Sequence, residues 1–502
     1  MLRTRQVRVV PTAALMLLAS ALAPTPKASA QAGAQAGAGL EAALALENVL
    51  VDAIAAAEKS VVAIARVPKD PLVGIPRGED PGMVPSGYGT GVVVDRRGLI
   101  LTNYHVLGDI EKYDYYVWTQ RRSFKVKGIE TREKPGKPGE DGQFKAVGVE
   151  AADPWFDLAV LKIDADNLEP IKFGDAGKLK KGQIVIALGN PYAIARDGEA
   201  SATWGIISNL RRHAPPLPDE DPLLPKDNTV QQYGDMIQTD AKLPQGASGG
   251  ALLNLKGEMI GLTSSLAALS NGETTAGFAI PVDDAFKRVV DRLKMGRRAD
   301  FGFLGVAPER STYIAAPGEL PAVRIDKVVP GTPAARAFLR PLDVVTHVDG
   351  VRLYDHYDLM REVGKMPVGK RVELTVVRDR RAPQIIPVTL AKKYLNTTRP
   401  VYGSAAEPMW RGMRVDYATA TPGEIFQQRA PELGLGNCVA VSEIEPDSPA
   451  WKAGLRRWTF ISHIEGKSVE DPEAFYKLLQ GREGPVQLRL IGGRETVTVE
   501  AP

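Results

Sequence analysis

The sequence predicts a mainly β protein that ends in two smaller α+β domains, and two patterns carry this prediction. In the first half, short apolar runs rich in Val and Ile alternate with turns marked by Gly, Pro and Asp, as in residues 87–106. In the second half, the chain repeats itself at an offset of 116 residues. The repeated positions are Pro330, Pro333, Ala334, Ala337, Leu339, His347 and Gly350, which correspond to Pro446, Pro449, Ala450, Ala453, Leu455, His463 and Gly466.

Length and composition narrow the class of protein. A chain of 502 residues is expected to form two to four domains, and 44% hydrophobic with 25% charged residues is typical of a soluble globular protein. Basic residues form no block interleaved with aromatics, so nucleic acid is not an expected partner. Cys438 is the only cysteine, which excludes an internal disulfide. The five histidines are scattered without ligand spacing, so we expect no metal and no cofactor.

The N-terminus has the pattern of a secretory signal peptide over residues 1–30. Basic residues precede an apolar segment at 9–22, and Ala28, Ser29 and Ala30 form a small-x-small cleavage site. The alternative, a retained membrane anchor, is less favoured because the apolar segment is shorter than the roughly 20 residues needed to span a bilayer. Removal of residues 1–30 takes the formal charge from +3 to −1, because the segment holds four basic residues and no acid. We expect an exported protein, periplasmic or secreted, with a flexible segment at 31–40.

Ser248 lies in a setting that suits a nucleophile. It stands between Gly246 and the pair Gly249 and Gly250, and an apolar run follows. Glycines permit a tight turn and a close backbone approach, which let two N–H groups point at a developing oxyanion. The same pattern is also common in ordinary turns, so a catalytic role requires a histidine and an acid elsewhere in the chain.

Two upstream residues meet that requirement. His105 follows a strand-like run, and Asp157 opens the apolar strand predicted at 158–163. A carboxylate at the start of a buried strand is costly unless something hydrogen-bonds to it, and an imidazole N–H would do so. The order His105, Asp157, Ser248 is that of the triad in chymotrypsin-type double barrels.

Several short motifs in the same order resemble the HtrA family of trypsin-like serine proteases. The matching segments are residues 102–106, 157–162, 189–191, 238–241, 246–250 and 277–281. The resemblance covers residues 41–295 and implies a chymotrypsin-like double β-barrel protease domain. It implies that His105 is the general base, Asp157 orients it and Ser248 is the nucleophile, with an oxyanion hole formed by the backbone N–H groups of Gly246 and Ser248.

The sequence departs from the family pattern beside the nucleophile. Ala247 stands where the family usually has Asn, and Pro244 and Gln245 stand where it has Asn and Pro. Proline fixes φ and has no N–H, which leaves open whether the oxyanion hole is preformed. Two insertions, 121–145 and 213–228, are rich in Pro and charged residues and are expected to be surface loops.

The C-terminal repeats resemble tandem PDZ domains, at 301–395 and 406–502, after linkers at 296–300 and 396–405. A PDZ domain adds a peptide to a sheet edge and holds its terminal carboxylate on a loop of backbone N–H groups. In the first repeat this loop is expected at Phe303, Leu304, Gly305 and Val306. In the second it is expected at Gly412, Met413, Arg414 and Val415, with Arg414 in place of the glycine. The second repeat could instead be only a spacer or an assembly surface.

These features together predict an exported, ATP-independent serine endopeptidase that degrades unfolded or misfolded proteins and is regulated by peptides bound at the PDZ domains. Its expected partners are unfolded polypeptides, C-terminal peptides and further copies of itself, since the resemblance implies a trimer or a multiple of trimers. The alternative is a catalytically silent protease-fold binding protein or holdase that acts through its PDZ domains. An enzyme that is silent until a peptide binds is a third possibility, which the sequence does not separate from the second.

Overall fold

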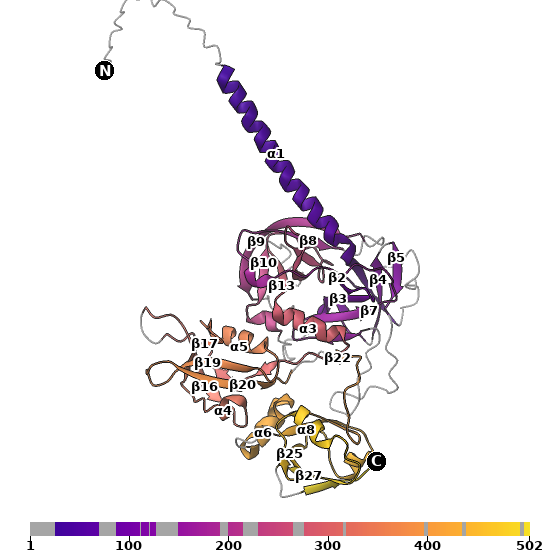
Figure 1. Ribbon diagram of the computed structural model, residues 1–502, viewed down its shortest axis with the longest axis vertical. Helices are drawn as coiled ribbons and strands as arrows, with labels where there is room; N and C mark the ends of the chain where they lie inside the picture. Colours follow the sequence, from indigo (N-terminus) through magenta and orange to yellow (C-terminus); the bar gives the residue numbers. More distant parts are fainter. Residues whose placement is uncertain are drawn as a thin grey trace, which may run out of the picture. The chain divides into compact units, whose positions relative to one another are not determined.

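A computed structural model describes most of the chain (Figure 1). The described residues are 26–69, 87–110, 112–119, 121–126, 149–190, 199–213, 229–264, 276–314, 318–395, 400–433, 438–491 and 496–501. Most of the predicted signal peptide and most of both predicted insertions therefore lie outside the described residues. Within the first insertion, residues 122–125 are described, and they form a strand rather than a loop. The chain divides into two units, residues 1–51 and 52–502.

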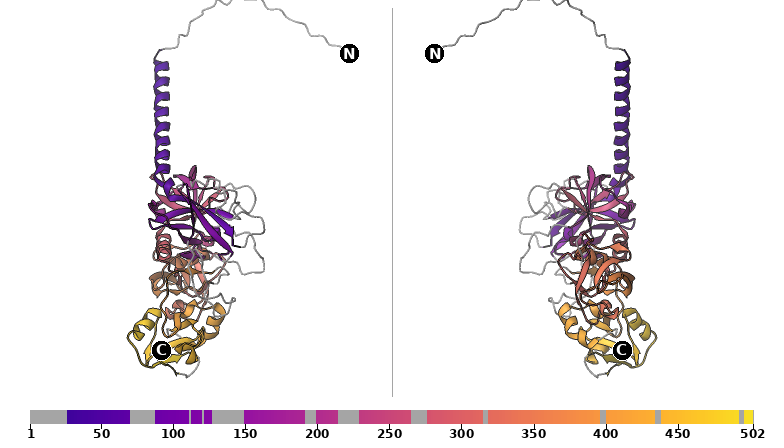
Figure 2. Two further views of the ribbon diagram at one scale, coloured as in Figure 1. Left: turned by 90° about the vertical axis from the view of Figure 1, so that its right-hand side faces the viewer. Right: turned by 90° about the vertical axis from the view of Figure 1, so that its left-hand side faces the viewer.

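The described part of the N-terminus is one long helix, α1, which spans Pro26–Ala57. Figure 2 shows α1 as an unbroken helix. The prediction of a helix from residue 41 is confirmed, but the prediction that residues 31–40 are flexible is wrong. The physical reason is the alanine content of this segment, because alanine has the highest helix propensity and offsets its interspersed glycines.

The first β-sheet after α1 has eight strands in the order β22-β6-β7-β3-β2-β1-β4-β5. Its strands from the N-terminal half are β1 (Val61–Pro68), β2 (Gly87–Asp95), β3 (Leu99–Asn103), β4 (Tyr113–Thr119), β5 (Arg122–Lys125), β6 (Ala151–Asp153) and β7 (Leu158–Lys162). Neighbouring strands are antiparallel, and their inward-facing aliphatic and aromatic side chains form one buried cluster. The short helix α2 (Tyr104–Leu107) follows β3 directly.

The outermost strand of this sheet comes from far along the chain. It is β22 (Tyr402–Gly403), which pairs with β6, so the predicted linker 396–405 is in part a strand of the first sheet. Tyr402 is 5% exposed and belongs to the buried cluster of the sheet. The predicted linker thus also contributes a strand, because an edge such as β6 presents unpaired N–H and C=O groups, which a passing extended segment can satisfy.

A closed barrel in the order β10-β13-β12-β11-β8-β9 forms the second part of the N-terminal half. Its strands are β8 (Ile184–Gly189), β9 (Ser201–Arg212), β10 (Met236–Thr239), β11 (Ala251–Leu253), β12 (Met259–Ser264) and β13 (Gly277–Pro281), with single turns η2 (Ala176–Lys178) and η4 (Val230–Tyr233). Helix α3 (Asp284–Lys294) follows, and the Asp283 carboxylate caps it by accepting from Phe286 N at 2.8 Å. Its apolar face, predicted from the helical period, is buried.

The two C-terminal repeats have sheets of the same order, β15-β16-β17-β19-β20 and β23-β24-β25-β27-β28. The first repeat contains β14 (Gly302–Phe303), β15 (Val306–Pro308), β16 (Val323–Val328), α4 (Pro333–Arg336), β17 (Val344–Val348), β18 (Val351–Arg352), α5 (His356–Gly364), β19 (Arg371–Val377), β20 (Gln384–Thr389) and β21 (Ala391–Lys392). The second contains β23 (Met413–Tyr417), η6 (Ala418–Ala420), α6 (Gly423–Leu433), β24 (Val439–Ile444), α7 (Pro449–Lys452), β25 (Phe460–Ile464), β26 (Lys467–Ser468), α8 (Pro472–Leu479), β27 (Val486–Leu490) and β28 (Thr496–Val499).

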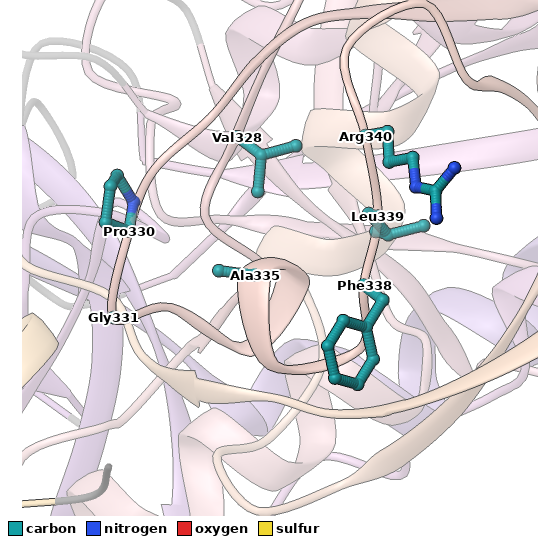
Figure 3. Close-up of a pocket in the computed structure, with 7 residues that line it drawn as sticks. All are labelled: Val328, Pro330, Gly331, Ala335, Phe338, Leu339 and Arg340. Atoms are coloured by element: carbon teal, nitrogen blue, oxygen red, sulfur yellow. The ribbon is translucent and has the colours of Figure 1, made fainter. Parts of the chain in front are cut away.

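A small apolar pocket lies beside α4 in the first repeat (Figure 3), with a volume of about 390 Å³. Its lining residues are Val328, Pro330, Gly331, Ala335, Phe338, Leu339 and Arg340. Phe338 and Leu342 have φ of 57° and 71° and are 65% and 68% exposed. Large side chains rarely adopt this left-handed backbone, so glycine would be the less strained residue at both positions.

Candidate active site

Strand pairing brings His105 and Asp157 together. Strands β3 and β7 are antiparallel neighbours with Asn103 opposite Leu158. His105 lies two residues after Asn103, and Asp157 lies immediately before Leu158. In an antiparallel pair, the end of one strand lies beside the start of the other, so the two side chains meet at the same edge of the sheet.

Two hydrogen bonds connect the pair. The His105 backbone N–H donates to Asp157 Oδ1 at 2.9 Å, and His105 Nδ1 lies 2.7 Å from Asp157 Oδ2. An ionised carboxylate can only accept, so Nδ1 carries the proton and Nε2 is the basic nitrogen of the ring. The histidine and aspartate side chains are 12% and 8% exposed. This arrangement fixes both the tautomer and the orientation of the imidazole.

The backbone of Asp157 is strained. Its φ of 55° lies in the left-handed region that residues other than glycine rarely adopt. Two donors hold its carbonyl: Tyr104 N at 3.0 Å and Asn103 Nδ2 at 3.3 Å. The end of β3 therefore fixes both the carboxylate and the carbonyl of Asp157, which offsets the conformational cost.

Ser248 lies in the turn that leads into β11, on the closed barrel. Gly246 and Gly249 have φ of 91° and 85°, and a Cβ on Gly249 would stand 2.0 Å from the carbonyl oxygen of Thr90. The turn therefore requires glycine at 249 for both its conformation and its close approach to β2. Ser248 is 4% exposed.

Thr90 joins the Ser248 turn to the first sheet, a role that the sequence analysis missed. Its N–H donates to Ser248 O at 2.8 Å, and its hydroxyl donates to Gly246 O at 2.7 Å. The same hydroxyl accepts from Asn190 N at 2.9 Å, and Thr90 O accepts from the Thr102 hydroxyl at 2.7 Å. The flanking glycines Gly89 and Gly91 face the side chains of Val106 and Ile100 rather than the Ser248 turn, so they do not signal this role in the sequence.

Hydrogen bonds within the turn and to Thr263 on β12 hold the turn in place. Ala247 N donates to Pro244 O at 3.0 Å, and Ala247 O accepts from the Thr263 hydroxyl at 2.5 Å. Gly249 N donates to Thr263 O at 2.9 Å. Within the described part of the chain, the N–H of Gly246 donates to no protein acceptor. This N–H belongs to one of the two predicted oxyanion donors.

The segment before Asp157 reaches the first repeat. Trp155 Nε1 donates to Gly364 O, at the end of α5, at 3.1 Å. Phe156 stacks on Phe301 with ring centroids 5.4 Å apart. Asp153 is fully buried, with Oδ1 accepting from Phe156 N at 2.7 Å and no partner for Oδ2 among the described residues. Burial raises the pKa of Asp153 to about 7.

Two basic residues, one in α5 and one directly after it, also join the first repeat to the N-terminal half of the chain. The Arg361 guanidinium donates to Tyr233 O at 3.1 Å and to Gly234 O at 3.3 Å. Lys365 lies between the carboxylates of Asp235, at 2.8 Å, and Asp283. Burial alone would lower the pKa of Lys365, but the two carboxylates outweigh burial and raise it. Lys365 therefore stays charged and links the first repeat to the cap of α3.

The structure revises the loop predicted at 412–415 in the second repeat. Gly305 O accepts from Val329 N at 2.9 Å, and Gly412 O accepts from Glu445 N at 2.7 Å. A Cβ on Gly305 would stand 2.1 Å from Thr332, and one on Gly412 would stand 2.1 Å from Ser448. Since residues 329 and 332 correspond to 445 and 448 at the repeat offset of 116, Gly412 is the counterpart of Gly305. The equivalent loop is therefore 410–413, and Arg414 does not replace its glycine.

Among the described residues, no group of three or more His, Cys, Asp or Glu side chains is arranged to hold a metal ion. No helix in the described part of the chain is long and apolar enough to cross a membrane.

Comparison with known proteins identifies the family. Residues 89–262 match the trypsin-like peptidase domain, and residues 302–385 match the PDZ domain. The chain is 31% identical over 416 residues to the probable periplasmic serine endoprotease DegP-like of Chlamydia muridarum, with 82% of this chain and 73% of the relative covered. This chain belongs to the DegP (HtrA) family of serine endoproteases.

Other relatives give the same result. The DegP-like protein of Halomonas elongata is 31% identical over 410 residues, with 80% of this chain and 76% of the relative covered. DegP of Salmonella typhimurium is 27% identical over 416 residues, with 82% and 75% covered. The solved HtrA-type protease AlgW with tripeptide is 25% identical, with a TM-score of 0.48, and 68% of this chain and 97% of that chain covered.

The predicted family and activity are confirmed. The protein is a mainly β, exported serine-type endopeptidase with a trypsin-like domain, and it binds polypeptide as its substrate. We refer to the first and second C-terminal repeats of this DegP-family protein as PDZ1 and PDZ2.

Proposed function

We propose that this DegP-family protein hydrolyses unfolded or misfolded polypeptides without ATP, and that His105, Asp157 and Ser248 carry the chemistry. The observation that carries the proposal is the doubly hydrogen-bonded pair of His105 and Asp157, at 2.9 and 2.7 Å. A buried carboxylate that binds the Nδ1 proton of a histidine leaves Nε2 free to accept a proton and fixes the direction in which Nε2 points. A holdase has no use for this arrangement.

In the proposed reaction, His105 Nε2 takes the hydroxyl proton of Ser248 as the serine oxygen attacks the scissile carbonyl. The protonated His105 is stabilised by Asp157 and gives the proton to the leaving amine. A water molecule, deprotonated by His105, then attacks the acyl-enzyme and releases the second product. The general base contributes on the order of 10² to 10⁴ in rate.

The tetrahedral intermediate places a negative charge on the former carbonyl oxygen. We propose that the N–H groups of Gly246 and Ser248 donate hydrogen bonds to this oxyanion. The support is the Gly246 N–H, which has no acceptor among the described residues, and the Thr90 hydroxyl bond that holds Gly246 O at 2.7 Å. One oxyanion donor is worth roughly 10² to 10³ in kcat.

The other domains are proposed to select substrates. We assign residues 41–295 to the protease, 301–395 to PDZ1 and 406–502 to PDZ2. The loop around Gly305 is proposed to hold the carboxylate of a polypeptide C-terminus. We also propose a homo-oligomer, a trimer or a multiple of trimers, which mass photometry of the mature protein would measure directly.

The test of the proposed function is cleavage of unfolded β-casein by the mature protein in the absence of ATP. Ser248→Ala should abolish cleavage, and Asp157→Asn should lower kcat by about 10⁴ because the amide favours the wrong histidine tautomer. Asp166→Asn, at an exposed position, is the matched control and should leave kcat unchanged. Cleavage that persists in Ser248→Ala would sink the assignment of the nucleophile.

A further inference from the structure

The two PDZ grooves differ at one equivalent backbone position, 308 in PDZ1 and 415 in PDZ2. The strand registers establish the equivalence, since Pro308 pairs with Ile325 and Val415 pairs with Val441, one repeat offset apart. Both pairs follow a β-bulge in the same place. Strands β15 and β23 are each the edge of their sheet, where an added peptide strand would bind.

An added strand forms hydrogen bonds at every second residue of the edge. If the loop at 304–306 holds the peptide carboxylate, the next groove-facing position along the edge is 308, opposite the third-from-last peptide residue. Val415 shows the direction in which this position faces, because its N–H points to helix α8 across the PDZ2 groove and away from β24. In PDZ1 this position is Pro308, which has no N–H to donate.

In PDZ2, the equivalent N–H is that of Val415, and it already donates a hydrogen bond to the side chain of Tyr476. The Tyr476 hydroxyl accepts from Val415 N at 3.2 Å and donates to Pro408 O at 2.8 Å. It therefore joins α8 to β23 and to the segment before the strand. Helix α8 also packs against β23, whereas α5 of PDZ1 packs against β14 and β17.

The PDZ2 loop is also closed on itself. Trp410 and Met413 exchange two backbone hydrogen bonds, N to O at 2.8 Å and O to N at 3.0 Å. Met413 is the counterpart of Val306, because both stand one residue after the loop glycine. Arg411 in the loop is tied down by bonds from its guanidinium to Val499 O and Gly484 O, each at 2.6 Å.

Two amides remain available in each loop. Among the described residues, the N–H groups of Leu304 and Gly305 donate to no acceptor, and neither do those of Arg411 and Gly412. The number of available loop amides therefore does not distinguish PDZ1 from PDZ2. The difference lies further along the edge strand. In PDZ2, the N–H groups of Met413 and Val415 donate to acceptors within the domain, whereas PDZ1 has Pro308, which carries no N–H, at the position equivalent to Val415.

We propose that PDZ1 reads only the carboxylate and last two residues of a polypeptide, because Pro308 withholds the next strand hydrogen bond, and that Tyr476 closes PDZ2 to peptides. This inference rests on the proposed function of PDZ1 as a C-terminal peptide site. Such a site accepts chain ends that share suitable last two residues, whatever sequence precedes them. It suits a protease whose substrates share an exposed terminus rather than a common motif.

The first experiment measures peptide affinity for full-length Ser248→Ala protein, which cannot cleave the probe. The probe is the peptide Gly-Ser-Gly-Ser-Gly-Ala-Leu-Val. It is compared with an analogue in which an ester replaces the amide bond between Ala and Leu. The ester makes the carbonyl of the third-from-last residue a weaker hydrogen-bond acceptor. Wild-type PDZ1 should bind both within about twofold. Pro308→Ala should bind the amide probe about three- to tenfold more tightly, as expected for one net hydrogen bond, and gain much less for the ester.

Pro387→Ala is the matched control, since Pro387 lies on β20, the opposite edge strand of the same sheet. It should leave both affinities unchanged. If the Ser248→Ala protein with Pro308 intact binds the amide probe at least threefold more tightly than the ester, the inference for PDZ1 is overturned. A probe with an amidated C-terminus tests the proposed function separately. If it binds as well as the free acid, or if the free acid does not bind, the C-terminal peptide site itself fails.

The second experiment counts peptides per chain by calorimetry with the free-acid probe. We expect one site in the Ser248→Ala protein and a second site after adding Tyr476→Phe, which keeps the ring but removes the hydroxyl bridge. Tyr417→Phe, on the same strand β23, is the control and should stay at one site. Two sites before the substitution, or one site after it in a protein with unchanged circular dichroism, would each overturn the closure of PDZ2.

Discussion

The hydroxyl of Thr90 donates to the carbonyl oxygen of Gly246 at 2.7 Å, across the junction between the first sheet and the closed barrel. The two residues are 156 positions apart in the chain. Through this bond the sheet that carries His105 and Asp157 holds the turn that carries Ser248. Thr90 touches none of the proposed reacting atoms, so it is a positioning residue.

Thr90→Val should lower kcat by about 10- to 100-fold with a smaller change in KM, because the shape is kept while the Gly246 carbonyl loses its donor. The unfolding free energy should fall by about 1–3 kcal/mol. Steady-state cleavage of a fluorogenic peptide separates the two constants. Thr119→Val, at a buried threonine on β4, is the control for stability alone. Equal losses of kcat in both variants would contradict a positioning role.

Asp153 should make stability depend on pH. Burial raises its pKa to about 7, and the Asp300 carboxylate acts in the same direction, while the Phe156 N–H and Arg288 oppose it. An acid with a raised pKa in the folded state stabilises the fold below its unfolded pKa, near 4, and loses that contribution as the pH rises through 7. The gain in unfolding free energy of Asp153→Asn over the wild type should therefore grow between pH 5 and pH 8, by roughly 3 kcal/mol.

Urea unfolding at four pH values measures this difference. The unfolding free energy of the wild type should fall relative to that of the variant as the pH rises. A difference that is constant with pH would show that Asp153 titrates as it does in the unfolded chain.

Tyr402 should stabilise the protease domain although it lies between the two PDZ domains in the sequence. Its side chain belongs to the buried cluster of the first sheet. Tyr402→Ala should lower the unfolding free energy of that domain by about 3 kcal/mol, the cost of truncating a buried aromatic ring. Hydrogen exchange followed by mass spectrometry would show increased exchange in β6 and β7. Val401→Ala, a half-buried neighbour, should have a much smaller effect, and similar exchange in both variants would argue against the role of β22.

Lys365→Met should separate PDZ1 from the protease domain. The substitution leaves the carboxylates of Asp235 and Asp283 without their cation, at a cost of about 3–5 kcal/mol. Calorimetry should then resolve a separate PDZ1 transition. Lys370→Met removes a surface pair with Asp349 and should cost less than about 1 kcal/mol. A single unshifted transition in the Lys365 variant would contradict the contact.

The sequence analysis succeeded where a local pattern determines the structure. The helical period predicted the buried face of α3, and the repeat offset predicted two sheets of one topology. It failed where the outcome depends on distant partners. Thr90 and β22 act through segments more than 100 residues away, and no local pattern reveals them.

The PDZ2 loop was misplaced for a related reason. The second repeat has nine more residues between its loop glycine and the repeated block than the first. A short pattern of glycine and apolar residues then fits at two positions. Only the hydrogen bonds to Glu445 and the contact with Ser448 select Gly412.

The two segments that join the domains are held against each other. Ala405 N donates to Gly296 O at 2.9 Å, Ser404 N donates to Glu150 O at 2.9 Å, and Ala299 is 5% exposed. A serine protease needs an accessible, extended stretch of backbone, whereas the described residues 298–300 and 400–405 of these joints are all buried or half-buried. The described parts of the two joints are therefore poor sites for autolysis, because the contacts that hold them together also withhold their backbone from an active site.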